Sequence, residues 1–221
     1  MRTHARIALL GTLLVATPAA AQICAGTASF AAGAARVGAS ASATKDVKSY
    51  GAAFALGQRV GPFGSVELAR NEYDPSGNST SLAVSAGYAI EAQANKKVQF
   101  CPHLTFGHEF MEDAETPLGT IESSANMFGL GATVGATTAL TPTADFVPFA
   151  SAHYVTVRAK QSVGNSSATF SDDYLALGVG AGFVLNRTVT IQPAVTVPLG
   201  LEGGNALFTI AFALNFGSAA R

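Results

Sequence analysis

The ten residues Leu207–Phe216 alternate between two kinds of side chain. Every second residue from Phe208 to Phe216 is large and apolar, whereas most of the residues between them are small or polar. A repeat of two is typical of a β-strand with one apolar face. Because no charge interrupts that face, it requires apolar surroundings, either a protein core or lipid.

The chain begins with a segment that is typical of exported proteins. Arg2 and Arg6 precede an apolar stretch at residues 7–16. A run of three alanines at 19–21 then offers a cleavage site. The stretch is shorter than the roughly 20 apolar residues that a membrane-spanning helix needs. We therefore expect a signal peptide over residues 1–21 and an exported mature chain.

The composition of the chain favours lipid as the surroundings of its apolar faces. Hydrophobic residues make up 48% of the sequence and charged residues only 12%, whereas a soluble domain usually carries about 25% charged residues. The alternative, a soluble β-barrel or β-sandwich with a hydrophobic interior, would have an outer surface with few charges. The formal net charge of -1 argues against nucleic acid as a partner, since no basic patch is present to neutralise phosphates.

Segments with the same two-residue repeat recur along the chain, separated by turn residues. Short links, such as Gly61-Pro62 and Asn186-Arg187, alternate with longer polar links, such as 74–79 and 112–122. This alternation is typical of outer-membrane barrels, which have short periplasmic turns and longer outer loops. We predict ten strands, with eight as the alternative because the first has a weak pattern. The expected ranges are 35–44, 49–60, 64–73, 80–92, 97–111, 123–138, 145–161, 169–185, 187–197 and 205–216.

The two faces of these predicted strands differ in chemistry. In the strand expected at 169–185, for example, leucine, valine and phenylalanine alternate with glycine and alanine. A Lys or Arg on the lipid face of a barrel costs about 2–4 kcal/mol at the bilayer midplane. The bulky apolar residues are therefore expected to face lipid, and the small and polar residues to face the lumen. Pro102, Pro148 and Pro193 fall inside predicted strands, and we expect them at bulges or strand ends.

The export signal, the alternating strands and the aromatic-rich last strand ending at Asn215-Phe216 together resemble the small outer-membrane β-barrel proteins of Gram-negative bacteria. The resemblance implies an all-β fold, a transmembrane antiparallel up-and-down β-barrel, in the cell outer membrane after export through the periplasm. It also implies outer-membrane lipids and the insertion machinery as partners, because that machinery reads the last aromatic residue. The expected organisation is a signal peptide (1–21), an N-terminal periplasmic segment (22–34), the β-barrel (35–216) and a C-terminal tail (217–221).

Ionisable residues on the small-residue faces are expected to point into the lumen. Buried charges must pair or be neutralised, so two readings stay open: a structural network that fills the barrel, and a polar path for a small solute. Side chains nearly fill the interior of a barrel of eight to ten strands, which excludes a wide, water-filled porin. By strand parity, the lumen-facing polar candidates are Arg59, Glu67, Glu91, His103, Glu109, Arg158 and Lys160.

Two cysteines in an exported chain can form a disulfide. Cys24 lies in the N-terminal segment and Cys101 lies early in the fifth predicted strand, so both are expected near the periplasmic mouth. We predict a Cys24–Cys101 disulfide, which could contribute about 4 kcal/mol of stability; two free thiols are the alternative. The four histidines and two cysteines show no metal-ligand spacing, so we expect neither a metal site nor a cofactor.

Acidic pairs at the outer ends of the strands are the nearest candidates for catalysis. Asp172-Asp173 and Glu112-Asp113 could activate water in principle, but the sequence holds no Asp-x-His or His-x-Ser pair of the kind found in outer-membrane enzymes. We therefore expect no catalytic residues and no enzyme activity. The predicted function is a structural or surface-interaction role in the outer membrane. The alternative is a narrow channel or transporter for small solutes.

Overall fold

The computed structural model describes residues 35–58, 60–74, 77–92, 95–116, 119–201 and 203–216. Within these ranges the chain is all β, and no helix is long and apolar enough to cross a membrane. The strands are β1 (Ala35–Ala43), β2 (Val47–Gly57), β3 (Gly61–Tyr73), β4 (Gly77–Ala92), β5 (Asn95–Met111), β6 (Ala114–Thr116), β7 (Gly119–Ala136), β8 (Thr138–Thr141), β9 (Ala144–Val163), β10 (Ser166–Leu185), β11 (Val189–Leu199) and β12 (Leu207–Phe216).

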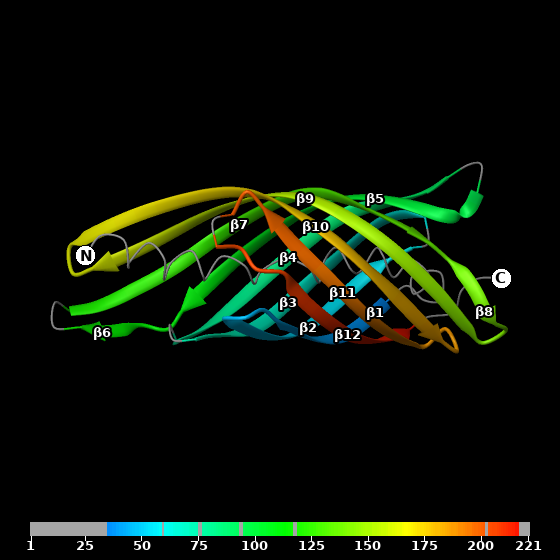
Figure 1. The fold of residues 1–221 in the computed structure, drawn as a ribbon, viewed down its shortest axis with the longest axis horizontal. Coiled ribbons are helices and arrows are strands. Elements are labelled where there is room, and N and C mark those ends of the chain that lie inside the picture. The colour runs from blue at the N-terminus through cyan, green and yellow to red at the C-terminus, as the bar shows by residue number, and fades with distance from the viewer. Residues whose placement is uncertain are drawn as a thin grey trace.

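Ten of the described strands close into one antiparallel barrel (Figure 1). β7 pairs with both β5 and β9, and β12 pairs with β1 to close the wall. The short strands β6 and β8 lie in two of the links and pair with β7 and β9, respectively. The prediction of a ten-stranded up-and-down barrel is confirmed, and the eight-stranded alternative is wrong. The weakly patterned β1 is held on both sides, because all nine of its residues pair with β2 and with β12.

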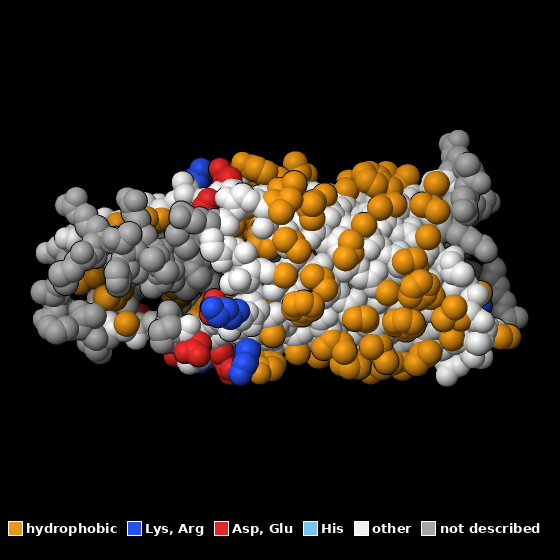
Figure 2. Space-filling model, in the orientation of Figure 1, with side chains coloured by type: hydrophobic (Ala, Val, Ile, Leu, Met, Phe, Trp, Pro, Cys, Tyr) orange, Lys and Arg blue, Asp and Glu red, His pale blue; other side chains and the backbone are white. Residues whose placement is uncertain are grey.

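The side chains of the wall alternate between the lumen and the outside, as predicted. In β12 every second residue is buried, and the exposed residues between them are the large apolar ones from Phe208 to Phe216. Figure 2 shows hydrophobic side chains spread over most of the visible wall, with charged side chains gathered near one end of this surface. We name this outward apolar surface the apolar belt. Its chemistry matches lipid rather than water.

The three strand prolines lie where a hydrogen-bonded ladder is interrupted or ends. The β4–β5 pairing is interrupted at Pro102, and the β10–β11 pairing is interrupted at Pro193. Pro148 lies one residue beyond the last pair between β7 and β9, Gly135↔Phe149. Proline has no N–H to donate, so it is tolerated where a ladder hydrogen bond is already missing. The prediction of bulges or strand ends is wrong, because all three prolines lie within strands and the register is the same on both sides of Pro102 and Pro193.

β9 and β10 are much longer than a membrane requires. Each has 20 residues, whereas roughly 9–11 residues cross a bilayer. The loop expected at 162–168 is mostly strand, because a two-residue turn at Gly164-Asn165 joins β9 directly to β10. Gly164 has a φ of 55°, as the first central position of a type II′ turn requires. Because of this turn, the pairing of β9 with β10 continues through residues 162–168, where the polar composition had indicated a loop.

Candidate functional site: the lumen and the projecting sheet

A row of aromatic rings and glycines crosses part of the inner wall at one level. On neighbouring strands, Phe63 pairs with Gly87, Gly87 with His103, His103 with Gly131, and Gly131 with His153. The ring centroids of Phe63 and His103 are 6.3 Å apart, and those of His103 and His153 are 4.6 Å apart. We name these five residues the ring–glycine row. It runs across β3, β4, β5, β7 and β9.

The glycines of this row leave the space that the rings occupy. A Cβ on Gly87 would lie 2.5 Å from the ring of Phe63 and 2.6 Å from the Cβ of His103. A Cβ on Gly131 would lie 2.4 Å from the backbone oxygen of Ala152. These separations are far inside van der Waals contact, so only glycine fits at either position.

A hydrogen-bonded cluster around Glu109 lies on part of the inner wall, nearer the outer mouth of the barrel. The Glu109 carboxylate accepts hydrogen bonds from Tyr73 and Ser79, and from Asn71 Nδ2 at 3.2 Å. Asn71 also donates to Ser79 at 3.0 Å and accepts from Ser49 at 2.8 Å. Asn71 and Ser79 are completely buried, and Glu109 is 4% exposed. This Glu109 cluster therefore links the inner faces of β2, β3, β4 and β5.

A third polar group lies at the seam where β11 and β12 meet β1. Arg36 of β1 donates to Gln192 Oε1 at 3.4 Å, and both side chains are buried. Asn215 of β12 donates to Thr190 Oγ1 at 3.1 Å and to the backbone oxygen of Thr188 at 3.2 Å. These bonds join the first strand of the barrel to its last two strands.

Beyond the apolar belt, the outer ends of β7, β9 and β10 continue with β6 as a sheet that rises past the other strands (Figure 1). We name this part the projecting sheet. β9 pairs with both β7 and β10 as far as Val163, whereas the β10–β11 pairing ends at Leu175↔Leu199. Over residues 166–174, β10 pairs only with β9 among the described residues. All residues from Ser166 to Ser171 are exposed.

The backbone groups on the unpaired edge of β10 belong to its odd-numbered residues. The two-residue turn makes the first pair of the hairpin a hydrogen-bonded one, and such pairs recur at every second residue. The N–H and C=O groups of Ser167, Thr169 and Ser171 therefore point away from β9. The amide of Asp173 agrees with this assignment, because it donates to Asp172 Oδ1 at 2.9 Å rather than to β9.

A charged group marks the boundary between the apolar belt and the outer loops. Arg70 forms an ion pair with Glu112, and Asn78 Nδ2 donates to Glu112 Oε2 at 3.0 Å. The hydrogen bonds from Arg70 and Asn78 hold the pKa of Glu112 below its usual range. The Glu112 carboxylate therefore stays charged in mildly acidic solution.

Comparison with known proteins gives a fold and no sequence relative. No protein-family model matches the chain, and no curated protein matches it in sequence. The β domain of the Bordetella autotransporter BrkA is 12% identical with a TM-score of 0.53, covering 82% of this chain and 98% of that chain. The translocator domain of autotransporter NalP from Neisseria meningitidis is 12% identical with a TM-score of 0.50, covering 82% of this chain and 87% of that chain. Ail, the attachment invasion locus protein of Yersinia pestis, is 14% identical with a TM-score of 0.41, covering 82% and 97%.

The chain has the fold of the bacterial outer-membrane β-barrel proteins. The resemblance inferred from the strand pattern is thus confirmed at the level of fold. Together with the apolar belt, this fold places the barrel in the outer membrane.

Four of the seven lumen-facing candidates lie on the inner wall of this outer-membrane barrel. His103 belongs to the ring–glycine row and Glu109 to the Glu109 cluster, while Glu67 and Glu91 occupy inward positions of β3 and β4. Arg59 lies outside the described residues. The four do not form one site, because His103 and Glu109 are six residues apart on β5.

Arg158 and Lys160 point outward, and their predicted lumen position is wrong. Both side chains are exposed, whereas Val155, Val157 and Ala159 on the opposite face of β9 are buried. The prediction assumed that a charged strand residue must avoid lipid by turning inward. β9 extends past the apolar belt, so an outward charge on its outer end meets water instead.

Cys101 is disulfide-bonded and buried on the inner wall. Its predicted partner, Cys24, lies outside the described residues, so the Cys24–Cys101 pairing stays a prediction. The signal peptide, the 22–34 segment and the 217–221 tail also lie outside them.

Sequence reasoning missed three important lumen residues for the same reason. Asn71 carries no charge, Gly131 carries no side chain, and His153 is one of four histidines whose spacing indicates no site. Each acquires its role from residues on other strands, so the register of the sheet is needed to find it. The one sequence signal is that Gly131 falls on the small-residue face of its strand, whereas His153 shares its face with large apolar residues such as Phe149 and Val155.

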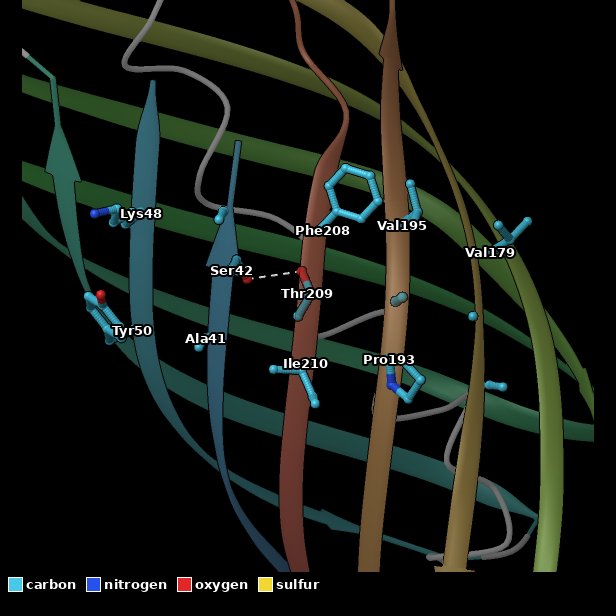
Figure 3. Close-up of a pocket in the computed structure, with 14 residues that line it drawn as sticks. Ala41, Ser42, Lys48, Tyr50, Val179, Pro193, Val195, Phe208, Thr209 and Ile210 are labelled. Atoms are coloured by element: carbon cyan, nitrogen blue, oxygen red, sulfur yellow. Dashed lines mark hydrogen bonds between the residues drawn. The ribbon is translucent and has the colours of Figure 1, made fainter. Parts of the chain in front are cut away.

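The outer face of the barrel carries a shallow groove of about 780 Å³ along β1 (Figure 3). Its floor is formed by Ala41 and Ala43, because β1 presents small side chains there. Tyr50 of β2 and Ile210 of β12, which pair with Ala41 on either side, form its walls together with Phe208. The groove is part of the apolar belt, where it faces lipid.

Proposed function

We propose that the protein is a non-catalytic, non-conducting outer-membrane barrel whose working part is the projecting sheet, which binds a partner at the cell surface. The observation that carries this proposal is that residues 166–174 of β10 pair with β9 on one side and with no strand of the described ranges on the other, which we call the open edge. An open edge presents unpaired N–H and C=O groups that an extended chain can complete by adding a strand. Barrel closure removes such edges from the wall itself, so this edge is where a partner strand can add.

The sequence of the edge also suits strand addition. Proteins commonly protect open edges with lysine or proline, and residues 166–174 contain neither. Phe170 offers an apolar side chain that is 38% exposed beside the edge. The Asp172 carboxylate caps one edge amide, so residues 167–171 form the accessible part.

The packing of the lumen supports the non-conducting half of the proposal. The ring–glycine row and the Glu109 cluster place buried rings and hydrogen-bonded side chains at two levels of the barrel. A lumen of this kind acts as a structural core that fixes the wall from which the sheet rises.

The edge is tested with a short peptide of alternating threonine and valine, labelled with a fluorophore and titrated onto the folded barrel in detergent. Ser171→Pro removes an edge N–H, whereas the matched control Ser171→Ala changes the side chain and keeps that N–H. We expect the wild type and Ser171→Ala to bind the peptide, and Ser171→Pro to bind at least about tenfold more weakly. Equal binding by all three, or no binding by any, would contradict an edge-binding role.

Conductance in planar bilayers tests the lumen. We expect wild-type barrels to insert without producing conductance steps. Reproducible steps from the wild type would instead favour a narrow channel for small solutes and overturn the non-conducting part of the proposal.

A further inference from the structure

The imidazoles of His103, which is buried, and His153, which is half-buried, lie side by side, and each has an unused nitrogen atom. The Nε2 atoms of both rings are buried and have no hydrogen-bond partner, and His103 as a whole is only 3% exposed. Buried polar atoms are nearly always paired, so an unpaired one points to a missing ligand. Here two such atoms belong to neighbouring rings.

The chemistry of His103 shows which of its nitrogens is available. Its Nδ1 lies 3.1 Å from the backbone oxygen of Cys101, and because a carbonyl oxygen only accepts, Nδ1 carries the hydrogen. In the neutral ring the lone pair is then on Nε2, the atom without a partner. Metal-binding histidines typically have this arrangement, in which the second nitrogen donates to a backbone carbonyl.

The register of the wall explains why two residues 50 positions apart meet. His103 of β5 and His153 of β9 both pair with Gly131 of β7, which lies between them. Because Gly131 has no side chain, the two rings lean toward each other across it. A Cβ at that position would lie 2.4 Å from His153 Nδ1.

The spacing of the rings suits two ligands on one metal ion. Two imidazoles bound at right angles, with metal–nitrogen bonds of about 2.0 Å, have centroids about 4.5 Å apart. The observed centroids are 4.6 Å apart and the rings are tilted by 53°. A right angle between neighbouring nitrogen ligands is the arrangement of a tetragonal Cu²⁺ site.

We propose that His103 and His153 bind a transition-metal ion that prefers imidazole ligands, with Cu²⁺ the tightest of the divalent series. The described residues contain no cluster of three or more His, Cys, Asp or Glu side chains that could hold a metal. The protein therefore supplies two nitrogen ligands, and water or a small solute completes the coordination. This inference is independent of the role proposed for the projecting sheet.

The test is a titration of CuCl₂ into the folded full-length mature barrel, prepared in detergent without a polyhistidine tag and followed by electron paramagnetic resonance. The wild type is expected to bind about one Cu²⁺ per barrel with hyperfine splitting from two nitrogens. His103→Gln and His153→Gln are each expected to lower the affinity by at least about tenfold and to remove the two-nitrogen signal.

His108→Gln is the matched control, because His108 lies on β5 but faces outward and hydrogen-bonds Asn126 at 2.8 Å. It is expected to bind Cu²⁺ like the wild type. Wild-type barrels that bind no stoichiometric Cu²⁺, or a signal that survives both lumen substitutions or is lost in His108→Gln, would overturn the proposal. Heat-modifiable migration shows whether each lumen variant folds. If a variant does not fold, the wild type alone tests the proposal: a two-nitrogen signal supports it, and the absence of that signal overturns it.

Discussion

The same three strands, β7, β9 and β10, build two regions with opposite properties. In the lumen, each inward side chain meets residues from the strands on either side, as Gly131 meets His103 and His153. In the projecting sheet, both faces of β10 are exposed from Ser166 to Ser171, and one edge is open as far as the described part of the chain shows. The wall is therefore held by contacts between neighbouring strands on its inner face. In the projecting sheet, one side of β10 has no strand partner among the described residues.

Gly131→Ala is expected to have the largest effect, because the new Cβ would lie 2.4 Å from a backbone oxygen that cannot move without displacing β9. Overpacking of this severity costs about 3 kcal/mol or prevents folding. The matched control is Gly129→Ala on the same strand, where the nearest atom would be 3.7 Å away, in ordinary contact. Urea unfolding in detergent, followed by heat-modifiable migration, measures both. Similar stability of the two variants would contradict the view that the row is tightly packed.

Glu109→Ala is expected to have the next largest effect. It would leave Tyr73, Ser79 and Asn71 without their shared acceptor in a buried place, which costs about 2–3 kcal/mol. Glu112→Ala is the control, because it removes a carboxylate of the same kind that also accepts hydrogen bonds but lies in solvent. The control is expected to change the urea midpoint little. A larger loss from Glu112→Ala would reverse the roles given to the lumen and the surface.

Proline substitutions at two adjacent residues of β10 distinguish its open edge from the edge that is bonded to β9. Thr169→Pro removes an N–H that points to the open edge, whereas Ala168→Pro removes an N–H that bonds to β9. We expect Thr169→Pro to leave hydrogen exchange in the β9–β10 hairpin nearly unchanged, and Ala168→Pro to raise exchange there by about tenfold or more. Neither should alter the urea midpoint of the barrel strongly. Equal loosening by both would mean that the edge is not open as described.

The fold could be predicted because period two is a local property of the sequence. Low charge and alternating strands were enough to predict the barrel, the number of strands and the outward direction of residues such as Phe208 and Phe212. Strand parity also placed Glu109 and His103 correctly. The same parity failed at Arg158 and Lys160, because the point at which β9 leaves the membrane is a property of the whole barrel.

The site could be predicted only in part, because its contacts depend on register. Gly131 is an ordinary small residue until β5 and β9 are aligned on either side of it. The projecting sheet was missed because polar composition at 162–168 indicates a loop, whereas the Gly164 turn lets the strands continue. Local sequence patterns therefore predict the strands of the wall. The arrangement of the lumen and the open edge depends on how the strands pair, which local patterns do not show.

The smallest expected effect comes from the turns that join the strands at opposite ends of the barrel. At the outer end the positive φ of 55° falls on Gly164, whereas at the inner end Asn186 and Arg187 have φ values of 50° and 59°. A left-handed conformation costs a residue such as arginine roughly 1 kcal/mol, while asparagine tolerates it better. Arg187→Gly is therefore expected to stabilise the barrel by about 0.5–1 kcal/mol, and Asn186→Gly by less. Urea midpoints of the two variants measure the difference. A loss of stability in Arg187→Gly would show that the arginine side chain contributes more at this turn than its strained backbone costs.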